Sequence, residues 1–355
     1  MAVCRPQVGR LQAFSTGASV CQDRVGSVGQ TTAMDLKPWA HAAFLDATCP
    51  LPLDVPFTAP VARAAGVPRH QLTWLCRQGL LRQPLPGVYY VAQLPDSTLL
   101  RAHCLALVVP DDCVIVDRHA GWLHGAEMVL APNEHLHTMA VRVFRPSGHG
   151  RLRNSLAESG ERDLRADDIM EVLGLPVTTP LRTAWDLGRV RSRERAISAL
   201  DAMLRLGLFS HDELIAGIER FRGQRWVTTL RAYAPLADGR AASPGESVLR
   251  LRWLDSGLPR PIPQFEVWSD GVLIAVLDLA NPDLWYAAEY DGEEWHSSDE
   301  QRAHDRARRG EVESRGFVVD AFTKRNVFGV HNNAEELLLA GARRANELRR
   351  TRVYL

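Results

Sequence analysis

The feature that most constrains the fold is a set of three strand-like segments in the last third of the chain: residues 264–268, 272–278 and 284–291. Each is short and rich in apolar, β-branched or aromatic side chains. Ser269-Asp270-Gly271 separates the first two segments, and Asp-Gly is a turn sequence typical of β-hairpins. The third segment is largely apolar, which favours a central position in the sheet. The three segments predict a sheet of consecutive strands.

Two helices and a further strand complete this part of the chain. Residues 243–254 begin with Ser and Pro, a typical helix start, and predict an amphipathic helix. A charged stretch over residues 300–315 ends at Gly316 and predicts a second helix, after which residues 317–322 return as a strand. Residues 241–345 are therefore expected to form an α/β core.

Carboxylates gather on two adjacent predicted strands. Asp278 closes one strand, and Glu289 and Asp291 lie two residues apart on the next, which places them on the same face. Glu246, on the preceding helix, is placed to supply one more oxygen. Clustered carboxylates repel one another unless a cation lies between them, and such oxygen ligands select Mg²⁺ or Mn²⁺. The simpler interpretation is that residues 289–292 are a strand end entering an Asp-Gly turn.

The N-terminal part, residues 35–100, predicts a different unit. Residues 60–66 form a short helix closed by glycine, Pro68 opens a second helix, and residues 80–91 read as a hairpin with its turn near Pro86-Gly87. Helix, turn, helix and a two-stranded wing make up a winged helix-turn-helix.

In a winged helix, the second helix enters the major groove of DNA and the wing lies near phosphates. The residues placed for DNA contact are Arg69, His70 and Gln71 on the second helix and Arg82 on the wing. The alternative is that this unit is a protein-interaction module.

This N-terminal segment resembles the winged helix of AbiEi-type transcriptional regulators, the antitoxin side of a type IV toxin–antitoxin class. Three stretches carry the resemblance: residues 64–70, 79–82 and 86–90. The resemblance implies a repressor-like or antitoxin-like role, with DNA as a partner and a cognate toxin as a possible second one.

The C-terminal segment resembles the DUF559 and very-short-patch-repair branch of the PD-(D/E)XK nucleases. The ordered residues that carry this resemblance are Glu246, Gln264, Asp278, Glu289-Tyr-Asp-Gly292, His296, Asp305, Arg308 and Gly316-Phe-Val-Val319. The resemblance implies a restriction-endonuclease-like core in which Asp278 and Glu289 bind the metal ion and Glu246 is the helix acid. Asp291 stands where the wider superfamily has a lysine, which leaves the role of that lysine open.

Further residues enter this predicted site. His296 is a candidate for proton transfer, and the alternative is that Lys324 approaches from the last strand; the candidate catalytic set is Glu246, Asp278, Glu289, Asp291 and His296. Arg306 and Arg308 lie on the charged helix, whose arginines suit contact with a phosphate backbone. The simpler interpretation of that helix is a solvated surface.

The rest of the chain gives weaker signals. Residues 1–34 lack apolar periodicity and predict a flexible extension, and residues 101–240 predict a mixed α/β middle region. Four histidines of the middle region, His119, His124, His135 and His137, suggest a metal site, but their spacing matches no metal-ligand pattern. The predicted fold class is thus multidomain α+β.

Composition limits the possible functions. Lys and Arg together number 42, as do Asp and Glu, so any DNA contact must come from local basic patches. The chain shows no apolar run of membrane-spanning length, no secretory signal and no CxxC pair, from which we expect a cytoplasmic protein without a membrane partner. Two functions remain open: a metal-dependent DNA endonuclease, or a non-catalytic DNA-binding regulator of antitoxin type. The sequence leaves the target sequence and the oligomeric state open.

Overall fold

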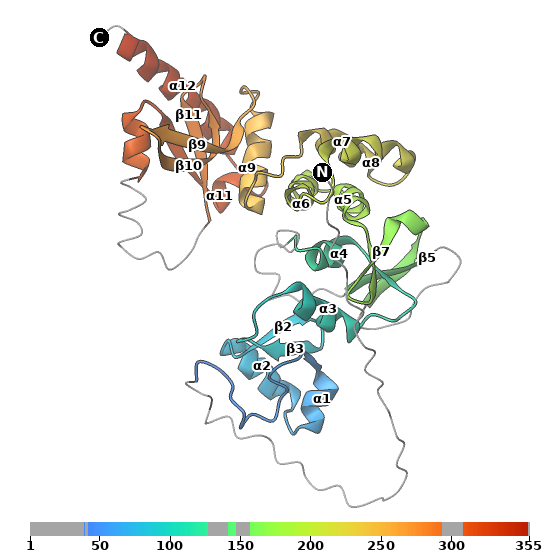
Figure 1. Ribbon diagram of the computed structural model, residues 1–355. Helices are drawn as coiled ribbons and strands as arrows, with labels where there is room; N and C mark the ends of the chain where they lie inside the picture. Colours follow the sequence, from blue (N-terminus) through green and yellow to red (C-terminus); the bar gives the residue numbers. More distant parts are fainter. Residues whose placement is uncertain (1–38, 40–41, 127–140, 147–156, 293–307, 354–355) are drawn as a thin grey trace, which may run out of the picture.

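A computed structural model describes residue 39 and residues 42–126, 141–146, 157–292 and 308–353 (Figure 1). The described chain contains helices and three separate sheets, so it is a mixed fold of the α+β kind that the sequence predicts. None of the described helices is both long enough and apolar enough to cross a membrane.

The N-terminal part has a helix pair beside a small sheet. Its elements are β1 (Phe57–Thr58), α1 (Ala59–Ala64), α2 (Arg69–Arg77), β2 (Leu81–Leu85) and β3 (Val88–Val91). The strands lie in the order β1-β3-β2, and the turn between β2 and β3 contains Gly87 with φ of 73°, a backbone conformation that favours glycine. Leu72 and Leu75 of α2 are buried against the sheet. The predicted hairpin and its turn are confirmed.

The middle part is a five-stranded sheet followed by helices. Its elements are α3 (Thr98–Ala106), β4 (Val114–Ile115), α4 (Asp117–Leu123), β5 (Val141–Pro146), β6 (Ala157–Arg162), η4 (Ala166–Asp168), β7 (Ile169–Val172), β8 (Leu175–Thr178), α5 (Pro180–Gly188), α6 (Arg193–Arg205), α7 (His211–Ala216), η5 (Ile218–Phe221), α8 (Val227–Tyr233) and η6 (Ala234–Leu236). The strand order is β6-β5-β4-β8-β7, with parallel and antiparallel neighbours. Side-chain oxygens of Thr179, Ser192 and Ser210 accept hydrogen bonds at the starts of α5, α6 and α7.

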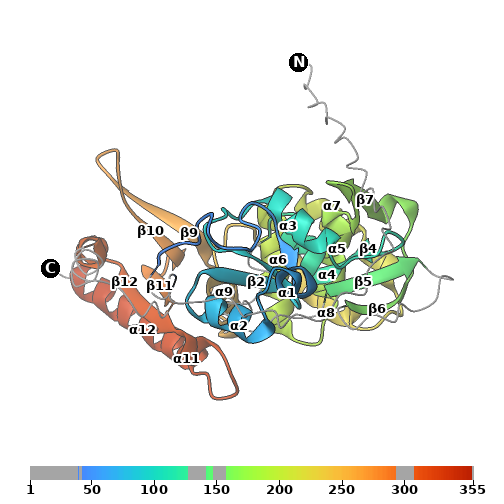
Figure 2. The same cartoon turned by 90° about the horizontal axis from the view of Figure 1, so that it is seen from below.

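The C-terminal part is a four-stranded sheet packed between helices. Its elements are α9 (Pro244–Asp255), β9 (Ile262–Ser269), β10 (Val272–Asn281), β11 (Tyr286–Asp291), a helical stretch over residues 308–314, β12 (Val318–Thr323), α11 (Lys324–Val327) and α12 (Ala334–Val353). The strand order is β12-β11-β10-β9, so β11 is central, as its apolar sequence predicts. The hairpin that joins β9 and β10 extends away from the other elements (Figure 2).

Two expectations for this part are wrong. Asp278 does not close its strand, because β10 continues to Asn281 and pairs there with Tyr286 of β11. Helix α9 is not amphipathic, because nearly all of its side chains as far as Trp253 are buried. The physical reason is that α9 is covered on one side by the C-terminal sheet and α12 and on the other by α6 of the middle part (Figure 1).

Ion pairs cross the boundary predicted at residue 240. Arg250 of α9 donates to both carboxylate oxygens of Asp201 on α6, at 2.8 and 2.7 Å, and both side chains are almost fully buried. Arg252 contacts Glu194 at 2.9 Å. The α6–α9 contact therefore contains charged groups withdrawn from solvent.

Candidate functional sites

Three acidic side chains converge in the C-terminal part, from α9, β10 and β11. The Ser243 hydroxyl accepts the Glu246 backbone N–H and starts α9 at that point. Glu246 Oε2 in turn accepts hydrogen bonds from Ala242 N (2.8 Å) and Gln264 Nε2 (2.9 Å). Glu246 is buried, so the start of α9 is tied to β9 through a carboxylate that faces the sheet.

Asp278 of β10 lies within the electrostatic reach of two other carboxylates. Its pKa is raised to about 7, first by burial and then by the negative charge of Glu246, with Glu289 adding to the effect. A hydrogen bond of 2.7 Å from the Tyr290 backbone N–H, and the charge of Arg308, act in the opposite direction. Glu246 and Glu289 thus lie near enough to Asp278 for their negative charges to raise its pKa.

Glu289 of β11 is held by two consecutive arginines. Arg308 Nη2 lies 3.1 Å from one carboxylate oxygen and Arg309 Nη2 lies 3.2 Å from the other. Arg308 also points toward the carbonyl of Val276 on β10, at 3.4 Å. Arg308 was expected to lie near phosphates; among the described residues it forms an ion pair with Glu289.

The other predicted members of this site divide into two groups. Asp291 is described and is exposed at the end of β11, whereas Glu289 is buried. His296 and Arg306 lie outside the described residues. Among the residues that the structure describes, no group of three or more His, Cys, Asp or Glu side chains has the arrangement of a metal site.

The N-terminal part presents a small basic surface on α2 and β2. Arg69 and His70, in the first turn of α2, are exposed, and so is Arg82 on β2. The expectation that Gln71 shares this exposed face is wrong, because its exposed fraction is only 5%. Leu72 and Leu75 define the buried side of α2. Gln71 precedes Leu72 and lies four residues before Leu75, a spacing that places it on the same side of the helix as Leu75.

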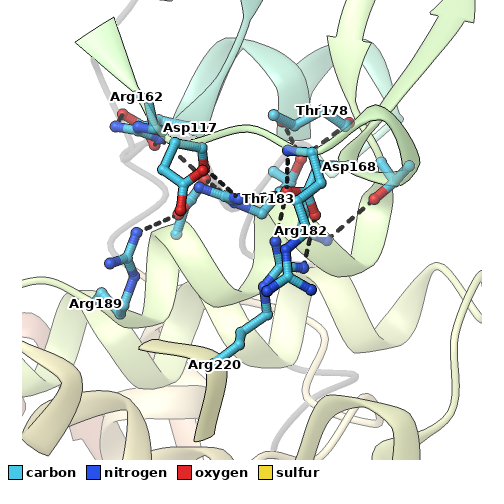
Figure 3. A network of polar contacts seen from close by, with 12 residues as sticks. Asp117, Arg162, Asp168, Thr178, Arg182, Thr183, Arg189 and Arg220 are labelled. Atoms are coloured by element: carbon cyan, nitrogen blue, oxygen red, sulfur yellow. Dashed lines mark hydrogen bonds and ion pairs between the residues drawn. The ribbon is translucent and has the colours of Figure 1, made fainter. Parts of the chain in front are cut away.

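Sequence analysis missed a charged network in the middle part. Asp117, the first residue of α4, accepts hydrogen bonds from both terminal nitrogens of Arg162, at 2.6 and 3.1 Å. Arg162 also forms an ion pair with Asp186 on α5, at 3.0 Å (Figure 3). Although burial raises the pKa of Asp117, Arg162 holds it below its ordinary value. Asp117 has φ of 54°, a left-handed conformation that aspartate tolerates better than most residues.

The network continues from Asp186 to a third aspartate, Asp168. Arg182 of α5 contacts Asp186 at 2.9 Å and Asp168 at 2.6 Å, and Arg220 contacts Asp168 at 2.6 Å (Figure 3). These pairs join η4, α5 and η5. The i,i+4 spacing of Arg182 and Asp186 is a sequence signal for one pair. The long-range partners, Asp117 and Arg162, have no such signal.

Of the four histidines considered for a metal site, the structure describes His119 and His124, and each has a separate backbone partner. His119 is buried, and its Nδ1 accepts the backbone N–H of Arg142 at 3.4 Å. The His124 ring lies 2.7 Å from the carbonyl of Thr178. His135 and His137 lie outside the described residues.

Two family models match the chain. Residues 56–92 match the model described as "Transcriptional regulator, AbiEi antitoxin", and residues 113–235 match the "AbiEi antitoxin C-terminal domain". The first match spans α1, α2 and the three-stranded sheet, and the second spans the segment from the five-stranded sheet to η6. Neither match extends into residues 241–345.

Two relatives come from Mycobacterium tuberculosis, one in strain CDC 1551 and one in strain H37Rv, and both are named as uncharacterized proteins. Each is 31% identical to this chain over 251 residues, which is 71% of this chain and 88% of the relative.

Proposed function

The chain belongs to the same family as these two mycobacterial proteins and carries AbiEi antitoxin domains, and from this premise we propose that it is a DNA-binding transcriptional regulator of the antitoxin type. The observation that carries the proposal is the pair of family matches, which together take in the N-terminal helix pair and the middle part. The proposed partners are DNA and a cognate toxin.

The N-terminal part is proposed to bind DNA as a winged helix. In this arrangement α2 enters the major groove with Arg69 and His70 at its leading end, and the β2–β3 hairpin lies along the backbone with Arg82 near a phosphate. The exposure of these three side chains supports the arrangement. Gln71 takes no part in it, because it is buried beneath the helix.

Fluorescence anisotropy with a DNA fragment from the chain's own promoter region tests this proposal. The double variant Arg69→Ala/His70→Ala should bind about tenfold or more weakly, since each lost base-edge contact is worth about 1 to 3 kcal/mol. Arg82→Ala should weaken binding by a smaller factor and reduce its salt dependence. The control is Arg231→Ala, an exposed arginine of α8 paired with Glu219. Equal affinity of all these variants and the wild type would refute the proposed face.

A second function, metal-dependent cleavage of DNA, is favoured by one observation in the C-terminal part. The pKa of Asp278 is raised to about 7, first by burial and then by the charge of Glu246, with Glu289 adding to the effect. Asp278 and Glu289 are the residues that would hold Mg²⁺ or Mn²⁺, although Glu289 is paired with two arginines and the described side chains do not have the arrangement of a metal site. When bound, the ion would lower the pKa of a water and stabilise charge on a phosphate.

The residues around that site have roles of their own. Gln264 and the N–H of Ala242 fix the Glu246 carboxylate, and Tyr290 N–H fixes Asp278. Incubation of supercoiled DNA with Mg²⁺ or Mn²⁺ tests the activity, with Asp278→Asn and Glu289→Gln as the variants. Nicking by the wild type that both variants lose would establish the endonuclease. Wild type and variants that all bind DNA and leave it intact would leave the regulator as the function.

A further inference from the structure

The side chains that form the ion pairs around Glu289 differ in solvent exposure, and this difference suggests that the arginines can exchange Glu289 for another anion. The Glu289 side chain is 11% exposed, whereas Arg308 and Arg309 are 29% and 36% exposed. The carboxylate therefore lies inside, and the guanidinium groups form the outer layer above it. Both arginines come from consecutive positions at the start of the described helical stretch over residues 308–314.

A guanidinium group binds a carboxylate and a phosphate with the same planar geometry, because both ligands offer two oxygens to its N–H groups. Glu289 here receives one nitrogen from each arginine rather than a bidentate contact from either. Each guanidinium group carries five N–H donors. The two guanidinium groups thus keep donors beyond those that Glu289 uses.

We infer that Arg308 and Arg309 form a binding surface for a phosphodiester group of DNA, and that Glu289 occupies this surface as an autoinhibitory contact in the free chain. The inference rests on the proposed DNA binding and adds a second surface to it. Because both arginines are partly exposed, a nearby backbone phosphate can compete with the carboxylate for their N–H groups.

The substitution Glu289→Gln removes the negative charge and keeps the shape of the side chain, and it should raise the affinity for DNA. In EDTA, without divalent metal, the full-length variant should bind double-stranded DNA about three- to tenfold more tightly than the wild type, because both arginines are released for phosphate. The dependence of log affinity on log salt should steepen by about 1 to 2 units. In the background Arg308→Ala/Arg309→Ala, the same substitution should give no gain.

The matched control is Glu311→Gln, which removes one negative charge from the same helical stretch. Glu311 is paired with Arg315, one turn further along and away from Glu289. If Glu289→Gln and Glu311→Gln raise the affinity equally, the effect is one of net charge and the inference is overturned. Glu289→Ala provides a second variant should the glutamine protein fail to fold, and it should show the same gain.

This outcome is separable from that of the proposed function. Loss of binding in Arg69→Ala/His70→Ala, together with equal affinities for Glu289→Gln and Glu311→Gln, would leave the winged helix standing and refute the Glu289 contact. If neither the wild type nor Glu289→Gln bound DNA, the proposed DNA-binding function and the inference about Glu289 would both be refuted. A gain in Glu289→Gln that the arginine-free background lacks would support the inference.

Discussion

Asp278→Asn should stabilise the C-terminal part at alkaline pH, although it removes a hydrogen-bonded side chain from the sheet. In the folded chain the pKa of Asp278 is raised to about 7 from an ordinary value of 3.8, first by burial and then by Glu246. An acid with a raised folded-state pKa keeps its proton in the native state longer than in the unfolded state. Its contribution to stability is therefore fully present below about pH 4 and is lost as the pH rises through 7.

The magnitude follows from the size of the shift. A shift of about three pH units corresponds to a free energy of about 4 kcal/mol at pH 8, which is an upper limit. Because Asp278 is only partly buried, solvent screening reduces this to an expected gain of about 1 to 3 kcal/mol. Asparagine keeps an oxygen that can accept the Tyr290 N–H, so the hydrogen bond of 2.7 Å need not be lost.

Hydrogen–deuterium exchange of peptides from β10 and β11, corrected for the intrinsic exchange rate, measures this local stability at pH 5 and pH 8. Slower exchange of Asp278→Asn at pH 8, with little difference at pH 5, is the expected result. The control is Asp270→Asn, which removes the same charge from the exposed β9–β10 turn. Equal changes at both pH values, or faster exchange of Asp278→Asn at pH 8, would refute the reasoning.

Three further substitutions test the packing and the ion pairs. Arg250→Ala should destabilise the chain by about 3 to 5 kcal/mol at pH 7.5 in urea unfolding, because Asp201 stays buried without its partner. The loss should shrink at pH 5, since burial raises the pKa of Asp201 to about 6; an equal loss at both pH values would contradict this. Gly245→Ala should lower the free energy of unfolding by about 1 to 3 kcal/mol, and the thermal midpoint with it, because the added Cβ would lie 2.0 Å from Tyr290 Cε1. Gly310→Ala is its control, with no atom within 4 Å of the added carbon, and a similar drop there would count against the packing argument. Thr179→Ala should destabilise by about 1 kcal/mol through loss of the hydroxyl that caps α5, and Thr179→Ser should restore it in the same thermal assay.

Local signals in the sequence predict the elements whose shape depends on nearby residues. Gly87 and Asp270-Gly271 have the positive φ values that their hairpin turns require, and Ser243 caps the helix that it was expected to begin. The central position of β11 follows from a run of apolar residues that only a sheet covered on both faces can bury. In each case the deciding atoms lie within a few residues of one another.

Contacts between distant residues explain what the sequence could not predict. Gln71 is buried because of how α2 rests on its sheet. The pairing of Asp117 with Arg162 joins residues 45 positions apart, and that of Glu289 with Arg309 joins residues 20 apart. From the sequence, polar residues of this kind are predicted to lie on the surface, because their burial depends on partners that periodicity does not reveal.

The buried pair of Arg250 and Asp201 has a consequence for how this chain can be divided or recombined. A gene cut at residue 240 would keep Asp201 and discard Arg250, and the shortened product would bury an uncompensated carboxylate under whatever covers α6 in place of α9. A fragment that extends to residue 256 would retain the partner but expose the side of α9 that packs on the C-terminal sheet. Neither cut yields an intact surface, so recombination that preserves folding should exchange the middle and C-terminal parts together.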